Sequence, residues 1–160
     1  LSLGFVTGLV SALTLAGMAA SIIGARMCLG NSRHRIMAFV GIASVMVALV
    51  CALVLEAPVW IALGCLFVYN VCIMLDSGAL TAGVVSVAGE RDRGALLAVH
   101  SMVGFAGGSL GAPAVGLMLD LGGGGDRLDA WTGAVLVMGL GSALVALIQW
   151  RAWRRHGFVV

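Results

Sequence analysis

Long apolar runs of similar length alternate with short polar joints along the whole chain. A helix that crosses the hydrocarbon core of a bilayer needs about 20 largely apolar residues. The pattern therefore predicts an all-α protein, a polytopic membrane bundle of five transmembrane helices. The predicted spans are residues 3–25, 36–55, 59–87, 95–119 and 130–150.

The composition supports lipid as the surrounding solvent. Hydrophobic residues make up 61% of the chain and charged residues 10%, whereas a soluble domain has about 25% charged and 45–50% apolar residues. A soluble fold of 160 residues could not hide so much apolar surface, so we expect one membrane domain over residues 1–160 with membrane lipid as a partner. Because the chain opens on Leu1 inside an apolar run, we interpret it as a fragment of a longer protein.

The arginine residues predict the orientation of the chain. All nine basic residues are arginine, and eight of them lie in the first and third joints and in the tail. Cytoplasmic loops carry an excess of basic residues, so we expect the N-terminus outside, the C-terminus in the cytoplasm and a bacterial cytoplasmic (inner) membrane as the location. The eight are Arg26, Arg33, Arg35, Arg91, Arg93, Arg151, Arg154 and Arg155.

Several classes of function are excluded by what the chain lacks. It has no lysine for a Walker A phosphate loop, and its arginines lie in short joints rather than in a basic patch with aromatics, so we expect no nucleic-acid binding. The four cysteines form no CxxC pair, which predicts neither a metal site nor a disulfide framework. No hydrolase motif is present, and we expect neither enzymatic activity nor a cofactor.

Candidate chemistry begins with a lone acid, Asp76, in the third predicted span. Tyr69 shares its helical face, and a second polar stripe of Asn70, Ser77 and Thr81 lies beside it. Ionisable groups within the membrane are costly and usually functional. One interpretation makes these residues the wall of a substrate path, with Asp76 as a proton or cation site. The other makes Asp76 a hydrogen-bonding link to a neighbouring span.

His100, in the fourth span, is the other titratable candidate. At 1.5 Å per residue, Asp76 lies roughly 16–18 Å from the joint between the two spans and His100 roughly 9 Å. Direct pairing of the two is therefore not expected. Two interpretations remain open: a relay from Asp76 to His100 through Thr81 or water, or local hydrogen bonding of His100 and Ser101 near the membrane edge.

The fourth span is rich in glycine. Glycines four residues apart allow two helix backbones to touch, and each costs roughly 1 kcal/mol relative to alanine in a helix interior. We therefore expect close helix packing through this span. The residues in question are Gly104, Gly107, Gly108, Gly111 and Gly116, with Pro113 between them.

Three stretches resemble the late helices of major facilitator superfamily transporters: DSGALTAGVV at residues 76–85, GERDRGALLAVHS at 89–101 and GFAGGSLGAPAVGLMLD at 104–120. The first joint resembles that family's loop between helices eight and nine. It keeps glycine and arginine at Gly24, Arg26, Gly30, Arg33 and Arg35, but it lacks the family's acid.

The resemblance implies a secondary transporter that works by alternating access, with this chain as the last five of twelve helices. It also implies that the absent N-terminal helices are partners, and that an unidentified small molecule, with a proton as candidate coupling ion, binds between the two halves. The alternative is a small multispan membrane protein that does not transport and acts as a structural or assembly partner. We rank a membrane-embedded enzyme below both.

Overall fold

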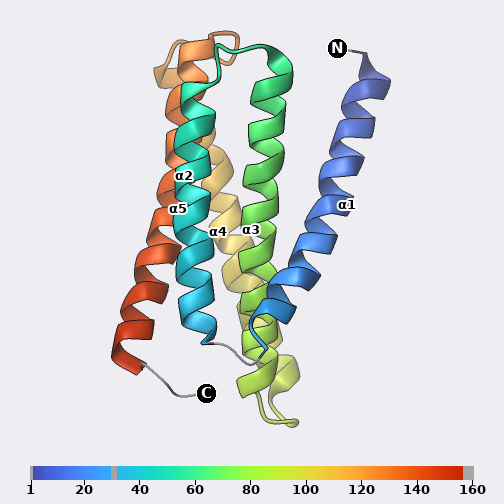
Figure 1. Ribbon diagram of the computed structural model, residues 1–160, viewed down its shortest axis with the longest axis vertical. Coiled ribbons are helices and arrows are strands. Elements are labelled where there is room, and N and C mark those ends of the chain that lie inside the picture. Colours follow the sequence, from blue (N-terminus) through green and yellow to red (C-terminus); the bar gives the residue numbers. More distant parts are fainter. Residues whose placement is uncertain (1, 30–31, 157–160) are drawn as a thin grey trace.

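The computed structural model describes residues 2–29 and 32–156, and within these ranges the chain folds into five helices without a strand (Figure 1). Each is long and apolar enough to cross a membrane, which indicates an integral membrane protein. The helices are α1 (Leu3–Met27), α2 (Arg33–Leu53), α3 (Val59–Val87), α4 (Arg93–Leu121) and α5 (Leu128–His156).

The helix ends follow local signals as well as apolar length. α3 coincides with the predicted span 59–87. It starts directly after Pro58, whose fixed φ and missing N–H suit the start of a helix. α2 begins at Arg33, inside the predicted basic joint, with Ser32 at the N-cap position. α5 continues six residues beyond Trp150 to His156. Helical geometry therefore extends past the apolar run into the basic tail.

The helices alternate in direction, and α3 lies between the others (Figure 1). α1 packs mainly on α3, α2 packs on α5 and α3, and α4 packs on α5 and more lightly on α3. A small core between α2, α3 and α5 contains Ala48, Cys51, Tyr69 and Val135. This order brings the C-terminal end of α1, the start of α2, the α3–α4 turn and the end of α5 to one end of the bundle. We call it the arginine end, because the eight arginines named above lie there.

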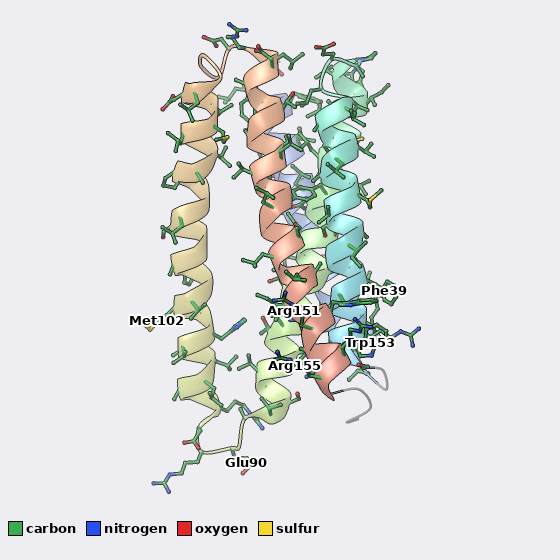
Figure 2. The ribbon with its side chains drawn as sticks, turned by 90° about the vertical axis from the view of Figure 1, so that its left-hand side faces the viewer. Phe39, Glu90, Met102, Arg151, Trp153 and Arg155 are labelled. Carbon is green, nitrogen blue, oxygen red and sulfur yellow. The ribbon has the colours of Figure 1, made fainter. Side chains whose placement is uncertain are left out.

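Most large apolar side chains point away from the bundle. Leu53 is 83% exposed, Phe105 78% and Met102 70%, and Figure 2 shows Met102 directed outward from α4. No residue of α4 is buried. A soluble monomer rarely exposes apolar surface on this scale, so the outer surface matches lipid rather than water.

The closest contact between helices is that of α1 with α3. A Cβ atom placed on Gly24 would collide with the backbone carbonyl of Leu75, and one placed on Gly78 would collide with the backbone carbonyl of Ser21. Gly17 lies against the Met74 side chain on the same line of contact. Small residues that allow backbones to meet are the usual basis of helix association in lipid. Glycine therefore sets the crossing of α1 and α3.

The glycines of α4 behave differently from this pair. A Cβ atom added at Gly104, Gly107, Gly108, Gly111 or Gly116 would have no neighbour within 4 Å in the described part of the chain. The helix also continues through Pro113 to Leu121. The expected close packing through α4 is therefore not made within these five helices, and it stays a prediction for contact with another segment.

We predict that Gly78→Ala destabilises the bundle by about 1–3 kcal/mol, because the added methyl group must push α1 and α3 apart. The matched control is Gly64→Ala on the same helix, whose Cβ would have no neighbour within 4 Å and which should be neutral or stabilising by up to about 1 kcal/mol. The measurement is the free energy of unfolding by detergent titration in bicelles, followed by circular dichroism. Equal effects of the two variants would contradict the assigned contact.

Candidate functional site

The two polar stripes of α3 face different neighbours. Tyr69, on the first stripe, packs against residues of α2 and α5 and shares a hydrogen bond of 3.2 Å with Ser142 of α5. The second stripe faces α1 and α4. Asn70 Nδ2 donates to the Leu13 carbonyl of α1 at 3.1 Å. Tyr69 and Asn70 therefore connect α3 to two neighbouring helices. The contacts of these two residues, which were predicted to line a substrate path, are structural ones.

Asp76 is half-buried, and its charge acts on the thiol of Cys28, the residue that directly follows α1. The Oδ1 atom of Asp76 is buried and has no hydrogen-bond partner among the described residues. Buried polar atoms are satisfied in the large majority of cases, and an exception calls for an explanation. A hydrogen-bonding link to a neighbouring span would leave this atom paired. This atom makes no such link within the described residues, and both interpretations of Asp76 stay predictions.

A second unpaired atom lies on the same side of the bundle. Arg33 reaches from the start of α2 to α3, where its Nη1 donates to Ser86 Oγ at 3.0 Å and its Cδ would lie 3.2 Å from a Cβ on Gly83. Its Nε is buried and has no hydrogen-bond partner among the described residues. Arg33 was predicted as part of a cytoplasmic loop. The structure makes it a bridge between two helices.

Cys28 connects Arg33 and Asp76 electrostatically. Burial raises the pKa of the Cys28 thiol, the charge and hydrogen bond of Arg33 oppose this rise, and the charge of Asp76 adds to it. The thiol therefore senses both the arginine and the acid. Spacing along the chain does not reveal this cluster, because Cys28 and Arg33 lie in the first joint and Asp76 follows them by 48 and 43 residues.

His100 pairs with Thr81 across the interface of α3 and α4. The His100 Nε2 atom lies 3.3 Å from Thr81 Oγ1, and this hydroxyl also donates to the Ser77 carbonyl at 3.1 Å. A hydroxyl group has one proton, so the imidazole Nε2–H is the donor when that proton points to Ser77. The structure therefore shows His100 in contact with Thr81, the residue named in the relay interpretation.

No hydrogen bond joins Asp76 to His100 in the described part of the chain. Thr81 follows Asp76 by five residues, which places it about 140° around α3, so the Thr81–His100 pair and the Asp76 carboxyl face different neighbours. Ser77, on the Thr81 side, is exposed. A direct relay from Asp76 through Thr81 to His100 therefore has no continuous path within the described residues.

The other predicted loop residues lie at the arginine end. Arg26, Arg91 and Arg93 are exposed. Arg35 is exposed as well, but it is held over aromatic rings of α2 and α5. Among residues 2–29 and 32–156, no group of three His, Cys, Asp or Glu side chains could hold a metal ion.

Comparison with known proteins adds no relative of this chain: no family model, no curated protein and no solved structure matches it. The arrangement therefore has to be interpreted on its own chemistry. Within the described residues it contains one carboxylate oxygen and one guanidinium nitrogen without hydrogen-bond partners, and a buried thiol on which both groups act electrostatically. Such a set can hold and release a proton or a small cation, and it contains no evident nucleophile–base pair.

We predict that Thr81→Val weakens the packing of α4 on α3 by about 0.6 kcal/mol and by no more than about 1.7 kcal/mol, the range for hydrogen bonds between membrane helices. Thr14→Val is the matched control, because Thr14 bonds only to the Val10 carbonyl in its own helix. The measurement is the free energy of unfolding in bicelles. A larger loss from Thr14→Val than from Thr81→Val would contradict the assigned contact.

Proposed function

We propose that this chain is the C-terminal part of a secondary active transporter that carries a small solute across a membrane by alternating access. The observation that carries the proposal is the Oδ1 atom of Asp76, which is buried on a helix of membrane-crossing length and has no hydrogen-bond partner in the described part of the chain. An acid in that position is costly unless it serves a bound ion or a polar path.

Three further features support the same function. Arg33 and Asp76 both act electrostatically on the same buried thiol, that of Cys28. The resemblance of residues 76–120 to late helices of the major facilitator superfamily gives a fold in which substrate sites lie between two helical halves. The outer surface of α4, with no buried residue and with open glycines, suits contact with further helices of the same transporter.

In this proposal Asp76 binds the coupling ion, with a proton as the first candidate. Occupation of the acid neutralises a buried negative charge, which lowers the cost of burying it and favours a closed arrangement of the helices around it. Release leaves a charged carboxylate that is stabilised by water or by Arg33. The eight arginines lie at the cytoplasmic surface, so the C-terminus is inside and the N-terminus of this chain is outside, in a bacterial inner membrane.

The alternative function is that of an assembly partner that does not transport. The open glycine face of α4 favours it specifically, because this face could take up a helix of a different membrane protein. Solute flux separates the two functions, since an assembly partner produces none in purified form.

We predict that Asp76→Asn reduces ion-coupled solute flux at least about tenfold, equivalent to about 1.4 kcal/mol or more, because an amide cannot bind and release the proton. The assay uses proteoliposomes of the full-length protein, an internal pH-sensitive dye and a panel of labelled small solutes. The matched control is Asp120→Asn, the same change at the exposed end of α4.

Retention of helix content by circular dichroism shows that the Asp76 variant is folded. Coupled flux that survives Asp76→Asn at the wild-type rate would remove Asp76 from the mechanism. An equal loss in Asp120→Asn would assign the effect to general charge rather than to the buried site.

A further inference from the structure

Aromatic and basic side chains gather on the outside of the bundle where α2 begins and α5 ends. The Trp150 and Trp153 rings meet edge to face, with centroids 5.0 Å apart. Phe39 of α2 lies 6.5 Å from Trp150 and 6.4 Å from Trp153 between centroids. Figure 2 shows Phe39 and Trp153 on the same side of the molecule. Together with Arg35 and Arg154, these residues form what we call the aromatic patch.

Arg35 is held in place within the patch. Its guanidinium carbon lies 5.9 Å from the Phe39 centroid and 5.7 Å from the Trp153 centroid. A guanidinium that stacks on rings through its faces keeps its N–H edge directed away from them. Arg154 follows Trp150 by four residues and therefore shares its face of α5, and it is exposed. Two arginines thus border the rings.

No acid of these helices balances this charge. α2 contains no Asp or Glu, and the single acid of α5 is Asp129 in its first turn, at the other end of the bundle. Glu90 lies in the α3–α4 turn, well away from Trp153 (Figure 2). The described part of the chain contains one ion pair, between Arg127 and Asp129. Neither Arg35 nor Arg154 has a carboxylate partner there.

The helix dipoles account for only one of the two patch arginines. Arg154 suits the negative C-terminal end of the α5 dipole, but Arg35 lies in the first turn of α2, where the dipole already favours an anion. Ser32 makes no side-chain capping bond there. The two helix ends are also held together, since His34 Nδ1 lies 2.7 Å from Gln149 Oε1. The result is a basic, aromatic surface that is complementary to a negative group.

An exposed apolar stripe leads away from the patch along α2. Phe39, Ile42 and Met46 are 51%, 43% and 58% exposed, and their spacing places them on one face. The stripe ends at an apolar groove between α2 and α3 with a volume of about 380 Å³, lined by Met46, Val50 and Val68 among others. From Phe39 to Val50 the rise is about 16 Å, which matches the length of a phospholipid acyl chain.

We propose that the aromatic patch binds an anionic phospholipid. Arg35 and Arg154 hold its phosphate, the tryptophans lie at headgroup level, and one acyl chain follows the α2 stripe into the groove. Basic clusters at the membrane surface attract anionic headgroups, and tryptophan favours this interface. The apolar stripe and groove commit the site to a lipid rather than to a free phosphate ester. The inference holds whether or not the chain transports a solute.

Tryptophan fluorescence tests the site directly. In a Trp60→Phe, Trp131→Phe background, Trp150 and Trp153 alone report. The protein is placed in phosphatidylcholine nanodiscs that contain a minor fraction of dibrominated phosphatidylglycerol or dibrominated phosphatidylcholine. We expect stronger quenching by the anionic lipid, and we expect its preference over phosphatidylcholine to fall about fivefold in each of Arg35→Gln and Arg154→Gln.

The matched control is Arg151→Gln, which removes the same charge about 160° around α5 from Trp153. Figure 2 shows Arg151 and Arg155 on the other side of α5 from Trp153, so this variant should keep the full preference. Arg35→Lys keeps the charge but loses the planar stacking and should lose part of the preference. If Arg35→Gln loses its helix content, the exposed Arg154→Gln variant provides the same test.

Three results would overturn the proposal. Equal quenching by the two lipids would mean that the patch has no headgroup preference. A loss in Arg151→Gln as large as that in Arg35→Gln would assign the effect to diffuse surface charge. Displacement of the anionic lipid by inorganic phosphate would identify a free-anion site instead of a lipid site.

Discussion

The structure depends on the requirement that helices in lipid satisfy their own backbone hydrogen bonds and then associate without a hydrophobic driving force. Association has to come from close packing and from polar contacts. Here the close packing is concentrated at Gly24 and Gly78, where the backbones of α1 and α3 meet. The polar contacts are made by α3, where Tyr69 bonds to α5, Asn70 to α1 and Thr81 to α4. α3 is therefore the element that organises the bundle.

This arrangement also explains why the candidate site lies where it does. Polar side chains on α3 that bond to neighbouring helices are satisfied and have structural roles. The exception is Asp76 Oδ1, which is buried and has no hydrogen-bond partner among the described residues. Arg33 and Cys28 come from the joint that connects α1 to α2, so the positions of α1 and α2 against α3 set the surroundings of the acid. The same helix packing thus supports the fold and shapes the site.

Much of the fold could be predicted from the sequence, because apolar length alone identifies helices that can cross a bilayer. The partners of each helix could not. Residues 104–116 carry the densest glycine pattern, yet these glycines are open, whereas the closest contact uses the sparser set of Gly17, Gly24 and Gly78. A small-residue pattern shows that a backbone can be approached, but it does not show which helix approaches it.

Part of the candidate site could also be predicted from the sequence. A lone acid in an apolar run is visible from composition, so Asp76 stood out, and its difference in depth from His100 followed from helical rise. The bridge from Arg33 to Ser86 could not be foreseen, because it depends on how far α2 extends into the first joint. The aromatic patch combines residues more than a hundred positions apart in the sequence, which periodicity along one helix cannot reveal.

The central claim is that five helices cross a membrane, with the arginine end in the cytoplasm. It is tested most directly by cysteine labelling in intact cells, in a background in which the four native cysteines are replaced by alanine. Ser32→Cys, at the arginine end, should react with a membrane-impermeant maleimide only after the cells are permeabilised, whereas Asp126→Cys, at the other end, should react in intact cells. Labelling of Ser32→Cys from outside intact cells, with Asp126→Cys protected, would contradict the arrangement.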